Sequence, residues 1–252
     1  MAWDAAAGVR GVSRPRTVTY GADPHQFAEL WLPPQEPRGV VVVIHGGFWR
    51  ARYDLSLGRP LAESLVEHGW AAWNVEYRRV GNGGGSPQTM DDVAAAIDAL
   101  ADHDLDLTRV ITVGHSAGGH LAAWSASRGR HDRWPVRVAV TGVVAQAGVL
   151  DLRAAYDEQL GSGAVEEFLG HPPGPADDPG DPVRQVPLGV PVHCVHGIAD
   201  DTVPVTQSRA YVAAATRAGA RAELTEVDGD HFVVIDPASD AWRQTLEILE
   251  DL

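Results

Sequence analysis

From about residue 38 onward, short runs of apolar, mostly β-branched residues alternate with longer segments whose apolar positions recur at helical spacing. The apolar runs contain few polar residues, as expected for parallel strands that are covered on both faces. The pattern predicts strands over Val40–His45, Ala71–Glu76, Val110–Gly114, Val138–Ala145, Val190–His196 and Arg221–Val227. It predicts helices over Leu55–His68, Thr89–Leu105, Ala117–Ser127, Thr206–Ala218 and Ala238–Leu252. This alternation is typical of an α/β protein whose mostly parallel, twisted sheet is flanked by helices.

Two further segments complete this picture. The stretches "RTVTYG" and "QFAELWLP" precede the first predicted parallel strand and predict a hairpin that adds antiparallel strands at one edge. The sheet is then expected to have about eight strands. Residues 150–187 contain short helical patterns and a Pro/Gly-rich loop, "GHPPGPADDPGDP", and are expected to form a small lid inserted above the sheet.

Composition narrows the possible partners and compartment. The 252 residues, of which 44% are hydrophobic, suit a single domain over residues 1–252. A formal charge of −14 disfavours nucleic acid and anionic membranes as partners. One cysteine, Cys194, allows no internal disulfide and no thiolate-rich metal site. With no secretory leader and no apolar run of bilayer length, we expect a cytoplasmic protein. The sequence does not distinguish a monomer from a homodimer.

The stretch "VGHSAGGHLAAW" joins a predicted strand to a predicted helix and contains Gly114-His115-Ser116-Ala117-Gly118. A sharp strand-to-helix turn of this kind tolerates only small residues beside its serine and exposes the hydroxyl above the sheet. The motif therefore predicts that Ser116 is a nucleophile. The alternative is that the serine and the glycines only cap a helix.

A serine nucleophile requires a histidine that takes its proton. In this architecture the acid and then the histidine follow the serine along the chain, on loops after later strands. Of the histidines after Ser116, only His231, in "VDGDHFVVID", lies beyond both the acid loop and the last predicted strand. We therefore predict that His231 is the catalytic base.

The acid is expected after the strand "VPVHCVHG", where "GIADDTVPV" supplies two adjacent carboxylates. We prefer Asp200 over Asp201, because the valine and proline that follow Asp200 can fix the loop against the next helix. Asp151, which follows the preceding strand in "AGVLDL", is a third candidate.

The stretch "VVVVIHGGFWR" ends a buried strand in a glycine pair. Glycines there let backbone amides approach a substrate, as the oxyanion of acyl transfer requires. We predict that the amides of Gly47, Phe48 and Ala117 form an oxyanion hole; Gly46 is a less favoured donor, and His45 is expected to hold the loop. The alternative is an ordinary turn with aromatics in the core. The aromatic side chains expected near a substrate pocket, besides Phe48, are Trp49, Tyr53 and Tyr77.

With "HGGFW", "GHSAGGHL", "DDTVPV" and "GDHF" in this order, the chain resembles the α/β-hydrolase superfamily over nearly its whole length. "HGGFW", "GHSAGGHL", "NVEYRR" and "AGVLDLR" look like segments of the kynurenine formamidase and related carboxylesterase branch. The resemblance implies a serine hydrolase that cleaves a small-molecule ester or an aryl formamide such as N-formylkynurenine through an acyl-enzyme. It implies no metal and no organic cofactor. A ligand-binding protein on a hydrolase scaffold is a further alternative.

Overall fold

The structure is a computed structural model and describes residues 14–252. The expectation that the chain lacks a secretory leader falls largely on residues 1–13, which lie outside the described residues.

The fold is built on one eight-stranded sheet with the strand order β1-β2-β4-β3-β5-β6-β7-β8. Strand β2 is antiparallel to both β1 and β4, and all other neighbouring pairs are parallel. The predicted fold class is therefore confirmed, including the leading hairpin. The strands are β1 (Arg16–Thr19), β2 (Phe27–Trp31), β3 (Val40–Ile44), β4 (Ala71–Val75), β5 (Val110–His115), β6 (Gly142–Gln146), β7 (Val192–Gly197) and β8 (Ala222–Val227).

Strand β3 occupies the centre of the sheet, which explains its unbroken apolar sequence. Every residue of Val40–Ile44 is buried. The strand pairs with β4 on one side and β5 on the other, and its last residue, Ile44, lies opposite Gly114 of β5. Because the two parallel strands end at the same level, the loop after β3 and the turn after β5 emerge side by side at one edge of the sheet.

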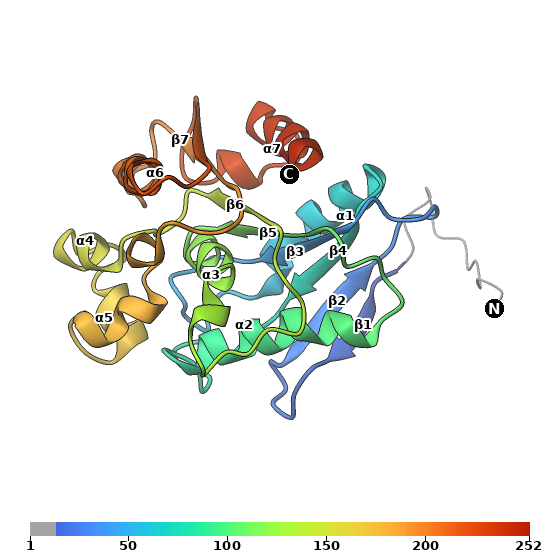
Figure 1. Cartoon of the computed structure of the whole chain (residues 1–252), viewed down its shortest axis with the longest axis horizontal. Coiled ribbons are helices and arrows are strands. Elements are labelled where there is room, and N and C mark those ends of the chain that lie inside the picture. The colour runs from blue at the N-terminus through green and yellow to red at the C-terminus, as the bar shows by residue number, and fades with distance from the viewer. Residues whose placement is uncertain (1–13) are drawn as a thin grey trace.

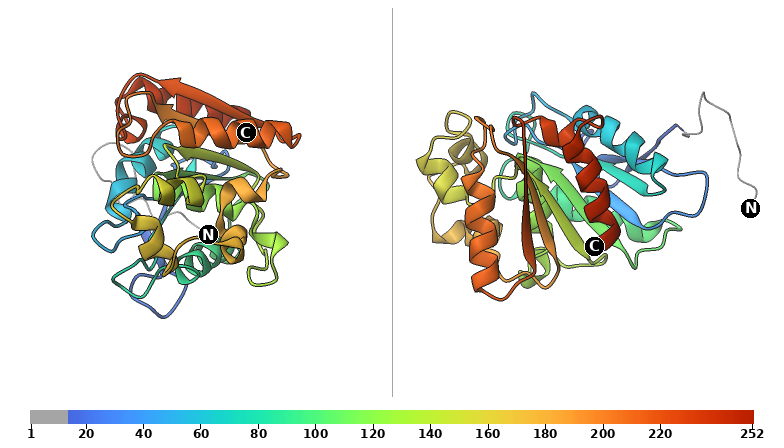
Figure 2. Two further views of the ribbon diagram at one scale, coloured as in Figure 1. Left: turned by 90° about the vertical axis from the view of Figure 1, so that its left-hand side faces the viewer. Right: turned by 90° about the horizontal axis from the view of Figure 1, so that it is seen from above.

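Helices cover both faces of the sheet (Figures 1 and 2). Helices α1 and α7 pack against one face, and α2, α3 and α6 pack against the other. The right-hand view of Figure 2 shows α6 and α7 on opposite sides of the last strands. The α-helices are α1 (Arg59–Glu67), α2 (Gln88–Asp98), α3 (Ala117–Ser125), α4 (Leu152–Asp157), α5 (Ala164–Leu169), α6 (Thr206–Arg217) and α7 (Asp240–Asp251). The 3-10 helices are η1 (Leu55–Gly58), η2 (Ala99–Asp102), η3 (Arg128–Arg130), η4 (Pro175–Gly180), η5 (Pro182–Gln185) and η6 (Val233–Ile235).

The segment predicted as an insertion lies between β6 and β7. It contains α4, α5, η4 and η5, and in Figure 1 the two short α-helices lie together at one end of the sheet. Three contacts place its α5 end against the loop after β3. Arg50 pairs with Glu167, the Phe48 ring packs on Gly161, and the ring of Trp49 stacks on that of Phe168.

Several predicted boundaries were wrong, among them the start of β6. The prediction began that strand at Val138, whereas the strand begins at Gly142. The amide of Val138 donates to the carboxylate of Asp98, and its carbonyl accepts from Arg128, so side chains take the backbone groups that a strand would pair. The helix predicted over Leu55–His68 begins as the 3-10 turn η1, and the one predicted to reach Leu105 leaves α-helical geometry after Asp98.

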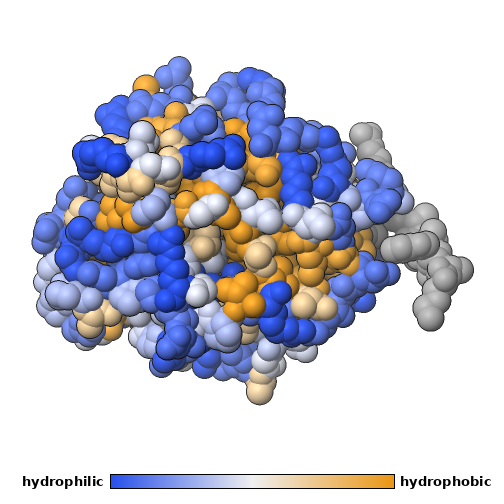
Figure 3. Space-filling model, in the orientation of Figure 1, coloured by the Kyte–Doolittle hydropathy of each residue, from blue (hydrophilic) through white to orange (hydrophobic). Residues whose placement is uncertain are grey.

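Figure 3 shows one face of the molecule, with hydrophobic side chains gathered in a band across its middle and hydrophilic ones around that band. Within residues 14–252, no helix combines the length and apolar character needed to cross a bilayer. The surface beyond the band is mostly hydrophilic on this face, in keeping with the charge of −14.

Gly118→Ala tests the close backbone packing at the start of α3. A Cβ at position 118 would lie 2.0 Å from the carbonyl oxygen of Ile44 and 2.6 Å from that of His45, and neither backbone atom can rotate away. We expect a loss of at least about 2 kcal/mol in the free energy of unfolding, measured by urea denaturation. Gly189→Ala is the control, because a Cβ there meets nothing within 4 Å. Equal unfolding midpoints for the two variants would contradict the packing described.

Candidate active site

Ser116 sits in a sharp turn between β5 and α3. Its backbone has φ 58° and ψ −121°, a conformation that is rare for a residue with a side chain and that costs about 1–3 kcal/mol. Two glycines let the chain turn this tightly. A Cβ on Gly114 would lie 2.0 Å from the carbonyl oxygen of Gly118, and Gly118 itself lies against the end of β3. The predicted strand–serine–helix turn is therefore present.

The glycine pair after β3 lies beside this turn. A Cβ on Gly46 would lie 2.8 Å from the carbonyl oxygen of His115 and 3.0 Å from the Cβ of Ser116. Glycine is thus required at position 46 because backbone and serine approach closely there. The prediction that this loop meets the serine agrees with the geometry.

His231 and Asp200 form a hydrogen-bonded pair at the same edge of the sheet. The Nδ1 of His231 lies 2.6 Å from Oδ2 of Asp200. Since a carboxylate only accepts, Nδ1 carries the proton in the neutral imidazole and Nε2 has a free lone pair. Both side chains are buried, His231 following β8 and Asp200 following β7.

His115, the residue before the serine, connects this pair to the turn. Its Nε2 donates to the carbonyl oxygen of His231 at 2.8 Å, and the centroids of the two rings are 4.4 Å apart. Burial, followed by the neighbouring His231, lowers the pKa of His115 to about 3, so the ring stays neutral and keeps donating. Sequence reasoning assigned no role to His115; its position immediately before the serine was the available signal.

Asp200 is held by its own loop and by a second histidine. Its Oδ1 accepts from the amides of Thr202 and Val203 at 2.9 and 2.8 Å. The Nε2 of His196 lies 3.2 Å from Oδ2 and donates to the carbonyl oxygen of Val203. Burial alone would raise the pKa of Asp200, but the groups from His196, His231 and Val203 outweigh burial and hold that pKa well below its usual range. Asp200 is therefore a carboxylate at neutral pH.

The two rival acids lie elsewhere. Asp201 is exposed, and its Oδ1 accepts from the hydroxyl of Thr202. Asp151 caps the N-terminus of α4 by accepting from the amide of Ala154. Of the three candidate acids, Asp200 is the one that contacts His231.

The loop after β3 carries backbone amides next to the serine. Gly47 has φ +113° and Phe48 has φ 52°, so the chain turns sharply here. Within residues 14–252, the amides of Gly47 and Phe48 donate to no backbone or side-chain acceptor. The amide of Ala117 opens α3, where the first amides have no intrahelical partner. These three N–H groups are therefore free to bind an anion.

Two of the aromatics expected at a pocket are core residues instead. Trp49 is fully buried, and its Nε1 donates to Nδ1 of His120. Tyr77 is also fully buried and donates its hydroxyl to the carbonyl oxygen of His45 at 2.7 Å. Each ring packs behind the loop and holds it from the core side, as the alternative of aromatics in the core expects. Tyr53 is 38% exposed and packs against Gly47, so it borders the loop.

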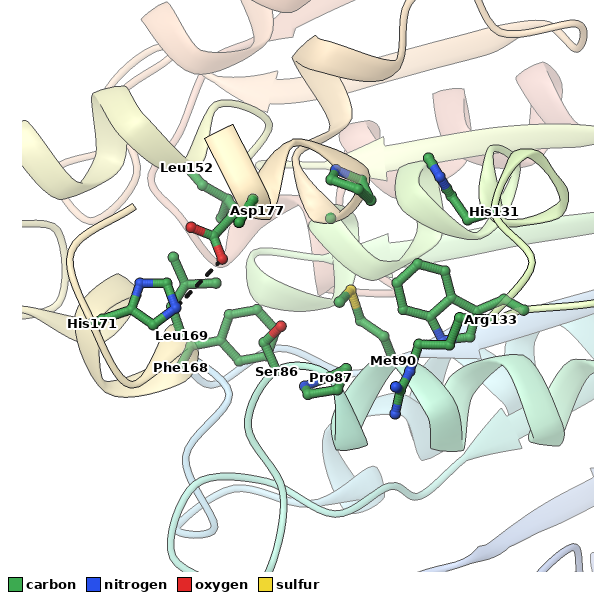
Figure 4. Close-up of a pocket in the computed structure, with 14 residues that line it drawn as sticks. Ser86, Pro87, Met90, His131, Arg133, Leu152, Phe168, Leu169, His171 and Asp177 are labelled. Atoms are coloured by element: carbon green, nitrogen blue, oxygen red, sulfur yellow. Dashed lines mark ion pairs between the residues drawn. The ribbon is translucent and has the colours of Figure 1, made fainter. Parts of the chain in front are cut away.

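A cavity of about 360 Å³ lies between the start of α2, the turn after α3, and the α5–η4 segment (Figure 4). Its apolar wall includes Met90, Trp134 and Phe168. Neither Ser116 nor His231 lines it. Phe168 stacks on Trp49, and Gly180, also in the wall, accepts from His120, so these rings adjoin the cavity on the side of the loop after β3.

A strained serine, a histidine–carboxylate pair and a glycine loop, all at one edge of a mostly parallel sheet, define an α/β-hydrolase. The model of the BD-FAE family, a family of α/β-hydrolase esterases, matches residues 29–214. The chain therefore belongs to the BD-FAE family.

Several curated proteins are similar in sequence. Esterase LipC of Mycobacterium tuberculosis is 28% identical over 218 residues, covering 78% of this chain and 54% of LipC. Esterase LipQ of the same organism is 29% identical over 93% of this chain and 60% of LipQ. Probable isoprenylcysteine alpha-carbonyl methylesterase ICMEL1 of Oryza sativa subsp. japonica is 26% identical over 85% of this chain and 56% of that protein. The chain thus spans a little over half the length of these relatives.

Solved structures share the fold at low identity. Esterase B of Lactobacillus rhamnosis superposes with a TM-score of 0.82 at 22% identity, covering 96% of this chain and 85% of that one. Esterase 2 of Thermogutta terrifontis gives 0.74 at 24% identity, over 96% and 91% of the two chains. A truncated carbohydrate esterase from gut microbiota gives 0.78 at 21% identity, over 96% of each chain.

The insertion contains a buried carboxyl whose ionisation is opposed by the fold. Oδ1 of Asp181 accepts from the amide of Leu152 at 3.1 Å, while Oδ2 has no hydrogen-bond partner among the described residues. Burial raises the pKa of Asp181 to about 7. A group whose pKa is higher in the folded than in the unfolded chain stabilises the fold at low pH, and that contribution is lost as the pH rises through the folded value.

Asp181→Asn tests whether the carboxyl of Asp181 has a raised pKa in the folded chain. The asparagine side chain stays neutral at every pH, so the variant should gain stability relative to wild type as the pH rises from about 4 to 8. The expected gain is a few kcal/mol, measured as the difference in urea-unfolding free energy between the two proteins at each pH. A difference that does not change with pH would show that Asp181 ionises normally.

Proposed function

We propose that the protein is a serine carboxylesterase in which Ser116 is the nucleophile, His231 the general base and Asp200 the group that orients the base. The observation that carries this proposal is the hydrogen bond of 2.6 Å from Nδ1 of His231 to Asp200. The carbonyl oxygen of the same histidine accepts a hydrogen bond from His115, which directly precedes the strained serine. The pair fixes the imidazole tautomer that leaves Nε2 ready to accept a proton.

The reaction proceeds through an acyl-enzyme. Nε2 of His231 takes the proton from the Ser116 hydroxyl as its oxygen attacks the ester carbonyl carbon. The imidazolium then gives that proton to the leaving alcohol as the tetrahedral intermediate collapses. In the second half, water loses a proton to Nε2 and attacks the acyl carbon. The imidazolium then returns that proton to Oγ of Ser116 as the acyl–oxygen bond breaks and the acid is released. Asp200 remains a carboxylate throughout and stabilises the imidazolium.

The three free amides of Gly47, Phe48 and Ala117 supply the oxyanion hole. Each pre-aimed donor is worth about 2.7–4 kcal/mol of barrier lowering in such sites. A low-dielectric surrounding strengthens these interactions, and the loop is backed by the buried rings of Trp49 and Tyr77.

The substrate class rests on the relatives, whose printed names describe esterases and methylesterases. An ester is accordingly the proposed substrate, and a small acyl group is consistent with the butyrate-bound form recorded for Thermogutta terrifontis esterase 2. N-formylkynurenine is a second candidate that rests only on the resemblance of "HGGFW" and "GHSAGGHL" to the kynurenine formamidase branch.

A substrate panel tests the proposal. Purified protein is assayed with p-nitrophenyl acetate, p-nitrophenyl butyrate and N-formylkynurenine, and kcat/KM is compared. We expect the esters to be turned over and to outpace the formamide. A higher kcat/KM for N-formylkynurenine would move the assignment to a formamidase, and a protein inert toward all three and toward a phosphonate probe would favour a non-catalytic binding protein.

Asp200→Asn and Asp201→Asn form a matched pair for the triad. Asparagine at position 200 presents the wrong partner to His231 and favours the unproductive tautomer, so kcat should fall on the order of 10³–10⁴-fold. Asp201 is exposed and contacts Thr202, so its variant should keep nearly full activity. Equal losses for the two asparagine variants would show that Asp200 does not orient the base.

Ser116→Ala should abolish turnover and phosphonate labelling while the protein remains folded by circular dichroism.

A further inference from the structure

A second buried polar network lies outside the proposed triad, on the core side of the loop after β3. It joins Glu76 and Arg79, which follow β4, to His45 at the end of β3, and all three side chains are at most 2% exposed. We infer that Arg79 is a positioning residue for the oxyanion hole and that it acts through the ring of His45. This inference rests on the proposed esterase function.

The contacts of Arg79 fix the protonation of His45. Its Nη1 donates to Glu76 and lies 3.1 Å from Nε2 of His45. Since guanidinium nitrogens only donate, Nε2 of His45 must accept. The ring's other nitrogen, Nδ1, therefore carries the proton and donates to the carbonyl oxygen of Gly46 at 2.8 Å. Burial and the charge of Arg79 lower the pKa of His45 to about 3, so the ring stays neutral at neutral pH.

The hydrogen bond to Gly46 sets the direction of an oxyanion donor. The carbonyl of Gly46 and the amide of Gly47 belong to one planar, trans peptide, so their C=O and N–H bonds point in opposite directions. Holding the carbonyl toward the core on His45 therefore turns the Gly47 N–H away from the core, on the side available to a substrate. The opposite tautomer of His45 would place a lone pair against the Gly46 oxygen, and the peptide would lose this restraint.

The other groups of the network restrain the same ring. The hydroxyl of Tyr77 donates to the carbonyl oxygen of His45, and the Tyr77 ring stacks on the imidazole with centroids 4.4 Å apart. The second oxygen of Glu76 accepts from the amide of Leu55 at 2.8 Å. Glu76 thus anchors Arg79 to a second backbone segment. Among the described residues, Arg79 is the one cationic side chain within hydrogen-bonding distance of the His45 ring.

A buried ion pair is weak evidence of stability in itself, because desolvation offsets much of the attraction between the charges. A purely structural pair would affect folding and leave the chemical step alone. The chain contains such a pair for comparison. Arg128 resembles Arg79 in three respects: it is 1% exposed, it pairs with a carboxylate, that of Asp98, and its buried Nε has no partner among the described residues. It differs in location, because its contacts lie at the far end of α3.

The experiment compares Arg79→Met with Arg128→Met in the full chain. Both remove a buried cation, so both should lower the urea-unfolding midpoint. Only Arg79→Met should lower kcat for p-nitrophenyl acetate, by about tenfold or more, while KM stays within about twofold of wild type. The reason is that a misdirected oxyanion donor weakens binding of the transition state and leaves binding of the ground-state substrate unchanged. The inhibition constant of phenylboronic acid, which forms a tetrahedral adduct on serine, should rise by a similar factor in Arg79→Met alone.

Arg79→Lys covers the case in which the methionine variant fails to fold. Lysine keeps the charge beside Glu76 but lacks the planar fork of arginine, so it should pair with Glu76 and leave His45 without its donor. Its kcat and its affinity for phenylboronic acid should fall in the same direction, by a smaller factor. A folded Arg79 variant with wild-type kcat and wild-type boronate inhibition would overturn the inference.

The outcomes separate this inference from the proposed function. If wild type hydrolyses the ester and Ser116→Ala does not, the function stands, and Arg79 variants that behave like Arg128→Met would overturn only the positioning role. If wild type is inert toward esters and boronate, both fail together.

Discussion

The close backbone contact between the first turn of α3 and the end of β3 is the constraint on which the rest of the site depends. Gly118 touches the carbonyl oxygens of Ile44 and His45, and Gly114 touches Gly118. Neither approach is possible with a side chain in the way, and both are needed to hold Ser116 at φ 58°. The same approach brings the loop after β3 against the serine, so one packing event positions both the proposed nucleophile and the amides proposed to bind the oxyanion.

The five buried histidines at this edge illustrate how hydrogen bonding assigns distinct roles to one residue type. His45, His115, His120 and His196 each place one ring nitrogen against a main-chain carbonyl oxygen, so that nitrogen carries the proton. His231 differs because its protonated Nδ1 donates to the carboxylate of Asp200 at 2.6 Å and not to a main-chain carbonyl oxygen, and a carboxylate partner becomes more favourable when the ring is charged. Burial lowers the pKa of His45 and His115 to about 3 and that of His120 to about 4, which keeps these three rings neutral.

Much of this arrangement was predictable from sequence, because it depends on local rules. The order of strands and helices follows from periodicity, and the turn at Ser116 follows from small residues between a strand and a helix. The preference for Asp200 over Asp201 is supported by its hydrogen bond to His231. The sequence left open whether Trp49 and Tyr77 face a pocket or the core. That choice depends on packing, because an aromatic near a strand end has no local signal that says which way its ring points. The role proposed for Arg79 could not be predicted from the sequence either, since it requires knowing that the segment after β4 lies behind the loop after β3.

The central claim is that the hydroxyl of Ser116, activated by His231, attacks a carbonyl whose oxygen is received by the amides of the loop after β3 and of Ala117. A crystal structure of the protein reacted with a short alkyl phosphonate tests it most directly. The account predicts phosphorus bonded to Oγ of Ser116 and a phosphonyl oxygen about 2.7–3.1 Å from the amide nitrogens of Gly47, Phe48 and Ala117. A phosphonyl oxygen directed away from these amides, or an adduct on another residue, would contradict it.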